Sequence, residues 1–158
     1  MRMFAFVKRR KAMIYIHYGA AQYNPELFKP ISNRPFSVKP HGGLWASSID
    51  AKFGWKDWCE AENFRECLEQ NSFRFRLRDD VSIIKINSKD DCSELPIVPV
   101  NPSYSGLNWL LIDFEQLVKD GVDVIQVNMS NDDRLYWALY GWDCDSILVM
   151  NKDVIEQI

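Results

Sequence analysis

The sequence predicts a mixed α+β fold built as a single domain, and three observations support this. Short runs rich in β-branched and aromatic residues are interspersed with helical stretches in an irregular order, which does not fit the regular alternation of a doubly wound sheet. The chain has 158 residues, of which 47% are hydrophobic and 26% charged, enough to bury one sizeable core. No repeat, low-complexity tract or linker divides it, so we expect one domain over residues 1–158.

Six segments are predicted strands, because each concentrates apolar and β-branched residues between turn-forming residues. They are residues 3–7, 12–19, 44–48, 81–87, 122–127 and 146–150. Between residues 20 and 40 the chain carries four prolines, which predict a long ordered loop instead. A loop of this length in a compact domain often carries function.

Helices are predicted in the remaining periodic segments. Residues 54–68 form one helix or two short ones, since their apolar stripe is imperfect. Residues 108–119 form a second helix that Gly121 ends. A short helix follows Asn131 or Asp132, either of which can cap it, and the chain closes in a helical turn after the last strand.

The composition of the chain argues against several classes of function. The formal net charge of −3 argues against binding nucleic acid over the whole surface. The four cysteines form no CxxC pair, and neither histidine is spaced to share a zinc site with them, so we expect no metal. No segment approaches the ~18 apolar residues of a membrane span, and the N-terminal apolar run is too short for a signal peptide. These features predict a cytoplasmic protein with reduced thiols and no membrane contact.

The segment around Gly42-Gly43 is the most informative local feature, because it leads directly into the predicted strand 44–48. A glycine pair adopts φ values that other residues avoid and lets a ligand approach the backbone. In the strand, Leu44 and Ala46 should face the interior, while Trp45 and Ser47 face the opposite side. An indole beside a hydroxyl suits a flat, polar ligand. The alternative is a glycine turn followed by an edge strand whose Trp belongs to the core.

Polar and aromatic residues recur at the edges of three predicted strands. His17 lies near the end of one strand, Trp45 and Ser47 lie in the next, and Asp143 and Asp145 stand just before the last. A nicotinamide-binding cleft between two small sheets needs this order of groups. His17 could equally be a satisfied core histidine, and the two acids could form a turn.

The same segments resemble a known family. His17, the Gly-Leu-Trp-Ala-Ser block at 43–47 and the Asp-Cys-Asp-Ser-Ile-Leu-Val-Met block at 143–150 occur in the order seen in the ADP-ribosyltransferase fold. The resemblance is to its His-Tyr-Glu class, which includes poly(ADP-ribose) polymerases and diphtheria-type toxins. It implies split mixed β-sheets with flanking helices, and NAD as the substrate.

A second resemblance covers most of the chain in scattered segments. The sequence is similar to uncharacterised phage and bacterial proteins that carry Lys-Pro-x-Gly-Leu-Trp, Trp-x-x-Trp-Cys-Glu-Ala-Glu and Gly-Trp-Asp-Cys blocks. Here these blocks lie at residues 39–45, 55–62 and 141–144. That group has no settled activity, so this resemblance implies none, and a phage-encoded protein that acts on a host protein is one of the hypotheses below.

The transferase resemblance implies a role for residues on the first two strands of the cleft. His17 would bind a ribose of NAD, with its second ring nitrogen oriented by a backbone group. Tyr18 stands between His17 and Gly19, so either His17 or Tyr18 fills the family's His position. Gly43 would open the second strand of the cleft.

Trp45 takes the place of the family's Tyr, so it would stack on the nicotinamide ring without supplying a hydroxyl. Ser47, on the same face, would help keep the cleft polar.

The resemblance also implies an acid on the last strand. Asp145 aligns with the family's Glu, because the strand follows it directly, and Asp143 lies two residues earlier. Such an acid would stabilise the developing oxocarbenium charge and orient the nucleophile. Asp is one methylene shorter than Glu, and a misplacement of ~1 Å can cost about a hundredfold in rate. The protein is therefore an active transferase, a hydrolase only, or a repurposed fold.

Three functions follow as hypotheses. The first is an NAD-dependent ADP-ribosyltransferase whose acceptor is a protein or a nucleic acid. The second is a non-catalytic interaction module or inhibitor that uses the aromatic-rich surface around Trp55 and Trp58. The third is a nucleic-acid binder that presents three arginines from one face of a strand. Its residues are Arg74, Arg76 and Arg78, with Phe73 and Phe75 on the opposite face.

Overall fold

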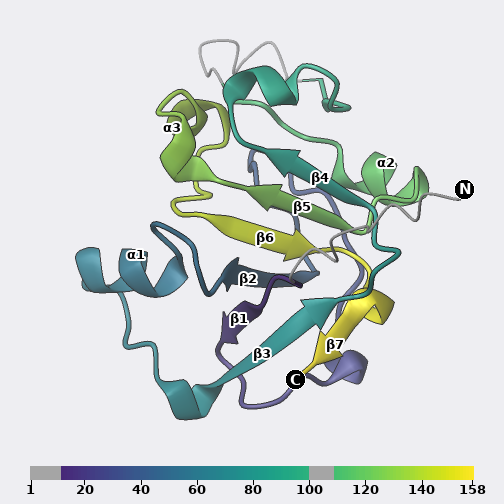
Figure 1. Cartoon of the computed structure of the whole chain (residues 1–158). Coiled ribbons are helices and arrows are strands. Elements are labelled where there is room, and N and C mark those ends of the chain that lie inside the picture. Colours follow the sequence, from purple (N-terminus) through teal and green to yellow (C-terminus); the bar gives the residue numbers. More distant parts are fainter. Residues whose placement is uncertain (1–11, 100–108) are drawn as a thin grey trace, which may run out of the picture.

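Seven strands and three short α-helices make up the computed structural model, which describes residues 12–99 and 109–158 (Figure 1). The strands are β1 (Tyr15–Tyr18), β2 (Leu44–Ser48), β3 (Ser72–Leu77), β4 (Ile83–Ile86), β5 (Val124–Val127), β6 (Ser146–Val149) and β7 (Ile155–Gln157). The helices are α1 (Trp55–Ala61), α2 (Phe114–Lys119) and α3 (Leu135–Ala138). Short 3₁₀ turns connect them at Pro25–Leu27, Glu69–Asn71, Lys89–Cys92, Met129–Asn131 and Lys152–Val154. The predicted mixed α+β class is confirmed.

The strands form one mixed sheet in the order β4-β5-β6-β2-β1-β3-β7. Only β4 and β5 run parallel, and every other neighbouring pair is antiparallel. In Figure 1 the sheet has two parts, with β4, β5, β6 and β2 in the upper half and β1, β3 and β7 in the lower half.

The junction between these halves is short. β1 and β2 pair only through Tyr15 with Ser48 and Ile16 with Ser47. Beyond that point β1 continues along β3, whereas β2 pairs with β6 as far as Leu44. The two strands therefore diverge at His17 and Trp45, which opens space between the halves of the sheet.

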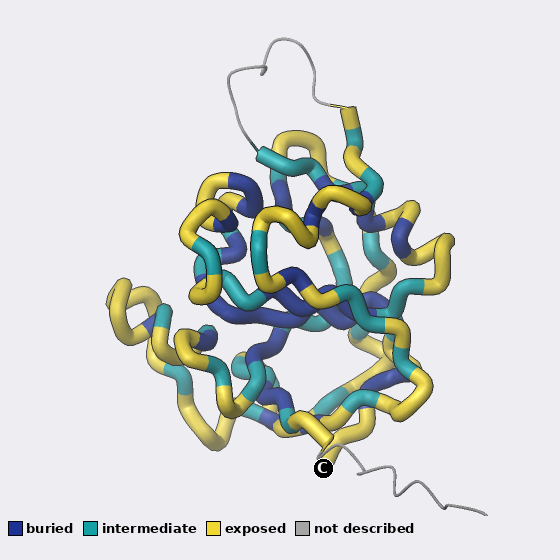
Figure 2. Tube along the Cα trace, turned by 45° about the horizontal axis from the view of Figure 1, so that its top comes forward, coloured by how far each residue is buried: buried dark blue, intermediate teal, exposed yellow. Residues whose placement is uncertain are grey.

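Two hydrophobic clusters cover the two faces of the central strands. Along β6 the side chains alternate, so that Leu148 joins one cluster while Ile147 and Val149 join the other. The first cluster includes Trp142, the buried residues of α2 and Leu135 of α3, and the second is built on Tyr15, Phe73 and Phe75. All residues of β5 and β6 are buried, which Figure 2 shows as a dark blue band through the middle of the molecule.

The helices are shorter than predicted. α2 begins at Phe114 rather than residue 108, because Asp113 caps it by accepting a hydrogen bond from the Gln116 amide. Just before the cap, Ile112 forms an isolated antiparallel bridge with Ile97. Within the predicted stretch 54–68, α1 ends at Ala61, and Asn63 then adopts a left-handed φ of 49°.

The predicted strand 44–48 is confirmed with the same bounds, and those within 12–19, 81–87, 122–127 and 146–150 are confirmed with narrower bounds. A helical turn does follow β6, but the chain then continues into a strand and does not close in the turn as predicted. The six predicted strands did not include β7, whose three residues are too short for an alternation pattern. They also did not include β3, which entered only as the strand of the nucleic-acid hypothesis. The predicted strand 3–7 lies outside the described residues. None of the helices in the described part of the chain has the length and apolar character that crossing a bilayer requires.

Candidate functional site

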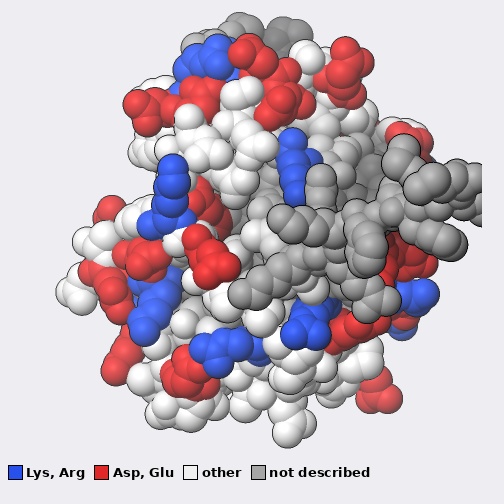
Figure 3. Space-filling model, in the orientation of Figure 1, with Lys and Arg blue, Asp and Glu red and all other residues white. Residues whose placement is uncertain are grey.

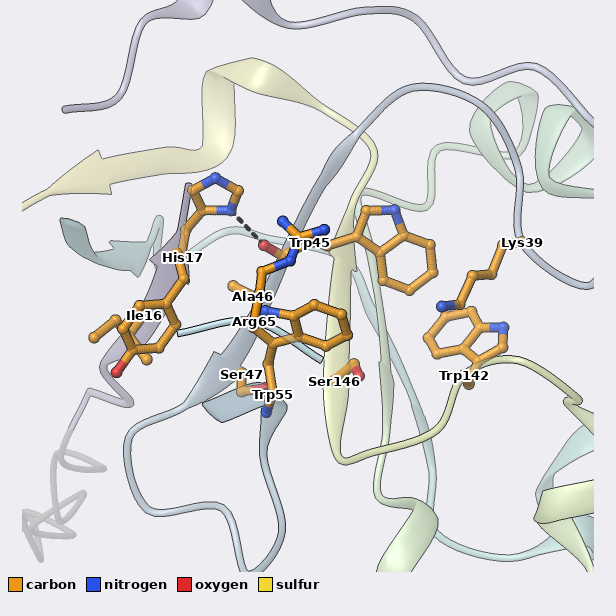
Figure 4. Close-up of a pocket in the computed structure, with 11 residues that line it drawn as sticks. Ile16, His17, Lys39, Trp45, Ala46, Ser47, Trp55, Arg65, Trp142 and Ser146 are labelled. Atoms are coloured by element: carbon orange, nitrogen blue, oxygen red, sulfur yellow. Dashed lines mark hydrogen bonds between the residues drawn. The ribbon is translucent and has the colours of Figure 1, made fainter. Parts of the chain in front are cut away.

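A cavity of about 240 Å³ lies where β1 and β2 diverge (Figure 4). Side chains from β1, β2, β6 and α1 line it, together with the loops that precede β2 and β6 and follow α1. The lining residues are Ile16, His17, Tyr18, Lys39, Trp45, Ala46, Ser47, Trp55, Arg65, Trp142 and Ser146. Four residues predicted from the sequence, His17, Tyr18, Trp45 and Ser47, therefore meet in one cavity.

His17 bridges the gap between the diverging strands. Its Nδ1 lies 2.7 Å from the carbonyl oxygen of Trp45, so the Nδ1–H donates to that carbonyl (Figure 4). This bond confirms that a backbone group orients one ring nitrogen, and in the neutral ring it leaves Nε2 as a hydrogen-bond acceptor. Burial lowers the pKa of His17 below its usual value, and the hydrogen bond to Trp45 opposes this more weakly.

The Trp45 ring contacts a second indole and a cation. Its ring meets the buried Trp142 edge-on, with centroids 4.7 Å apart. The ammonium of Lys39 lies 5.3 Å from the Trp45 ring centroid, within the range of a cation–π interaction. Figure 4 shows Lys39 directing its ammonium toward these two indoles.

A second indole and a second cation lie on the α1 side of the cavity. Trp55, the first residue of α1, stacks on Trp58 with ring centroids 5.2 Å apart. The guanidinium of Arg65 lies 5.9 Å from the Trp55 ring and 4.8 Å from the Phe64 ring. Phe64 is half exposed and packs edge-on against Trp55, so this aromatic cluster extends from the cavity to the surface.

The charge of the cavity wall is positive. Among the described residues, those that line the cavity include Lys39 and Arg65 but no Asp or Glu. On the face drawn in Figure 3, by contrast, basic and acidic side chains are interspersed. The cavity thus combines electron-rich indole faces with two cationic groups.

Ser47 lines the cavity, but its hydroxyl forms hydrogen bonds with backbone groups of two other segments. The Oγ donates to the backbone carbonyl of Asp145 at 2.8 Å and accepts from the Trp55 amide at 3.0 Å. Ser47 therefore ties the start of α1 to the start of β6, which positions Trp55 at the cavity.

Asp145 does not share the cavity with Trp45 and His17, which differs from the expectation. Its carboxylate is buried and accepts hydrogen bonds from the Ser130 amide, the Ser130 hydroxyl and the Phe53 amide, at 2.8, 2.8 and 3.2 Å. These donors come from loops beside β6, so the side chain faces the protein interior. Its geometry is that of a structural anchor for the two loops.

Asp143 is the predicted acid that contacts a cavity residue. Its Oδ2 lies 3.9 Å from the Lys39 ammonium. Partial burial raises the pKa of Asp143, while Lys39 opposes this and Glu62 adds to it. Asp143 also has a left-handed φ of 59°, which places its side chain on a tight turn between Trp142 and β6.

The two predicted glycines have different surroundings. A Cβ at Gly19 would come no closer than 3.6 Å, to Nε2 of His17, so Gly19 stands beside the free nitrogen of that ring. A Cβ at Gly43 would lie 2.7 Å from Leu148 and 2.8 Å from the Val149 carbonyl. Gly43 is therefore required for packing against β6, and it does not line the cavity.

Lys39, Trp142 and Arg65 are among the lining residues for which the sequence predicted no role. Lys39 lies in the Lys-Pro block and Trp142 in the Gly-Trp-Asp-Cys block, so these two sequence blocks could have indicated that both residues belong to the site. Arg65 follows a helix whose end the sequence did not locate, and no local pattern pointed to it. Within residues 12–99 and 109–158, no group of three His, Cys, Asp or Glu side chains is placed to hold a metal ion.

The arginines of β3 form a separate feature. Arg74 pairs with Glu69 at 2.9 Å and Arg78 with Asp80 at 3.3 Å, so acidic neighbours partly offset their charge. Phe73 and Phe75 are buried on the opposite face.

Comparison with protein-family models, with curated proteins and with solved structures gives no significant match to this chain.

Proposed function

We propose that the protein is an NAD-binding member of the ADP-ribosyltransferase type, with split mixed sheets, that transfers ADP-ribose to a protein or nucleic acid. The observation that carries the proposal is the cavity at the divergence of β1 and β2. It holds His17, Tyr18, Trp45 and Ser47 together in the order that the resemblance implies.

The chemistry of the cavity wall supports this substrate. NAD carries a planar, positively charged nicotinamide ring and a negatively charged diphosphate. The indole faces of Trp45 and Trp55 each hold a cation within 6 Å in the structure, which is the interaction a pyridinium would use. Arg65, the second cation of the wall, supplies positive charge for the diphosphate. One ligand that bears both groups is complementary to the whole wall.

In this proposal the Nε2 of His17 accepts a hydrogen bond from a ribose hydroxyl, because Nδ1 is already bound to Trp45. Trp45 stacks on the nicotinamide ring. The glycosidic C–N bond breaks with its electron pair going to nicotinamide, and the acceptor's nucleophile forms the new bond to the ribose carbon.

Asp143 is the acid we assign to this step, since it pairs with a cavity residue, whereas the carboxylate of Asp145 is held by three hydrogen bonds elsewhere. Its carboxylate would stabilise the oxocarbenium charge and take the nucleophile's proton. Asp145 would then support the site by fixing the loops beside β6.

Calorimetric titration with NAD tests the binding step. We expect Trp45→Ala to weaken binding at least tenfold, while Trp137→Ala, which removes an exposed indole outside the cavity, leaves it unchanged. Release of nicotinamide from NAD should fall in Asp143→Asn. The proposal is wrong if the wild-type protein shows no heat with millimolar NAD.

The aromatic cluster on α1 favours a second candidate, a protein-interaction module. Trp58 and Phe64 pack together with ring centroids 5.3 Å apart, and Phe64 is 52% exposed. Exposed aromatic clusters of this kind anchor protein interfaces. This candidate requires a complex that NAD does not perturb and that the double variant Trp58→Ala, Phe64→Ala disrupts. A partner that dissociates when NAD is added would count against it.

A further inference from the structure

The ammonium of Lys39 lies over one face of the Trp45 ring, so a nicotinamide that stacked on that face would meet it. It lies 5.3 Å from the centroid of Trp45 and belongs to the cavity wall. Trp142 already covers an edge of the same indole, at 4.7 Å and an interplanar angle of 70°. A flat ring can therefore stack on this face of Trp45 only if the Lys39 side chain moves.

The backbone just before Lys39 is held in place, so the Lys39 side chain can move about a fixed base. The carbonyl of Val38, the residue before Lys39, accepts a hydrogen bond from Nε1 of Trp142 at 3.1 Å, and both residues are almost fully buried. The Lys39 side chain itself is 32% exposed. Its four-carbon stem gives the ammonium room to swing about a fixed base.

Asp143 offers the displaced ammonium a second position. The Nζ–Oδ2 distance of 3.9 Å is longer than a good charged hydrogen bond, so the pair is loose in the present arrangement. A small shift of the ammonium away from Trp45 and toward Asp143 would shorten it. Lys39 therefore has two competing partners, an indole face and a carboxylate.

We propose that Lys39 competes with the nicotinamide ring for Trp45 and thereby ejects the product of cleavage. This inference rests on the proposed function. The ring of NAD is a pyridinium, which restores the cation–π attraction that the indole loses when Lys39 leaves. Cleavage gives the C–N electron pair to the ring, so the product nicotinamide is neutral and recovers only stacking. The ammonium then regains the Trp45 face, and nicotinamide leaves.

Direct titration with nicotinamide tests the competition without requiring catalysis. Tryptophan fluorescence should report at least fivefold tighter binding in Lys39→Met than in the wild type, because the methionine carries no charge to hold over the indole. Lys39→Gln should tighten binding in the same direction and provides a second neutral variant. Lys39→Arg keeps a cation and should leave the affinity within twofold of the wild type. Trp45→Ala in the Lys39→Met background should remove the gain.

Two outcomes separate this inference from the proposed function. If the wild type binds NAD but both neutral variants bind nicotinamide no tighter than it does, the competition by Lys39 is refuted while the NAD site stands. If the wild type does not bind NAD, the proposed function fails, whatever nicotinamide does. Product inhibition gives the matching kinetic result: the inhibition constant for nicotinamide should fall at least fivefold in Lys39→Met.

Discussion

At the scale of single residues, the side chain of His17 supplies a hydrogen bond where the backbone pairing between β1 and β2 ends. β1 and β2 stop pairing after Ile16, and the imidazole then supplies the donor for the carbonyl of Trp45. The imidazole thus satisfies the half-buried carbonyl of Trp45. The strands can therefore separate here without leaving a backbone acceptor unpaired, which keeps the free-energy cost small. The same bond fixes the ring orientation on which the proposed ribose contact depends.

Because burial lowers the pKa of His17, we expect a pH-dependent stability that depends on this residue. The unfolded chain takes up a proton near the ordinary value of 6.5, while the folded chain resists protonation to lower pH. The unfolded state thus binds more protons in that window, so stability falls as the pH drops below 6.5. Urea unfolding at pH 7.5 and 5.5 measures the loss.

His17→Asn provides the control, since its amide N–H can donate to the Trp45 carbonyl but does not titrate. Between pH 7.5 and 5.5, His17→Asn should lose less unfolding free energy than the wild type. Identical pH dependence in both proteins would show that His17 is not the titrating group.

At the scale of elements, Gly43 determines how β2 begins against β6. Its φ is 71°, and a side chain there would strike Leu148 and the backbone of Val149. Gly43→Ala should therefore destabilise the fold by about 2–4 kcal/mol, the sum of left-handed strain and overpacking. Gly121→Ala is the matched control, because its φ is 84° but nothing lies within 4 Å of the added Cβ. Chemical unfolding measures the loss of unfolding free energy in both variants, and the difference between them is the contribution of packing. Equal losses in Gly43→Ala and Gly121→Ala would contradict a packing role for Gly43.

Asp145 holds two loops onto the start of β6. Its removal in Asp145→Ala leaves the Phe53 and Ser130 amides without their acceptor, and we expect a loss of about 3 kcal/mol in unfolding free energy. A denaturant titration measures this, with Asp133→Ala as a control for an exposed acid. If Asp145→Ala were fully stable yet abolished nicotinamide release, the acid would belong to the chemistry and not to the scaffold.

At the scale of the whole molecule, the sheet joins a fully buried centre to an exposed edge strand. β5 and β6 are buried on both faces, while two of the three residues of β7 are exposed at the edge. Amide hydrogen exchange should therefore be slowest in β5 and β6 and markedly faster in β7. Equal protection across the sheet, measured by NMR, would mean that the two halves unfold as one unit.

Much of the fold was predictable because strand patterns are local. The runs at 81–87, 122–127 and 146–150 are rich in apolar and β-branched residues, which is typical of strands, and all three contain strands in the structure. Helix ends were less predictable, since tertiary contacts set them. The amide of Phe114 donates to the side chain of Asn33, a residue far away in the sequence.

The candidate site was predictable only in part. Trp45 and Ser47, which period-two alternation predicted to share a face, both line the cavity, but so does Ala46, which it assigned to the opposite face. The same alternation could not place Asp145, whose orientation depends on donors at Phe53 and Ser130 in other loops. Arg65 reaches the cavity only because α1 ends at Ala61.

The sequence by itself determined the mixed α+β class, most of the strands and the aromatic and histidine groups of the site, since these depend on local periodicity and residue chemistry. The tertiary structure alone decided where β1 and β2 separate, which acid contacts the cavity, and that Lys39 lies over Trp45. These features arise from contacts between segments that are distant in the chain. Such contacts depend on how whole elements pack, and no window of the sequence contains them.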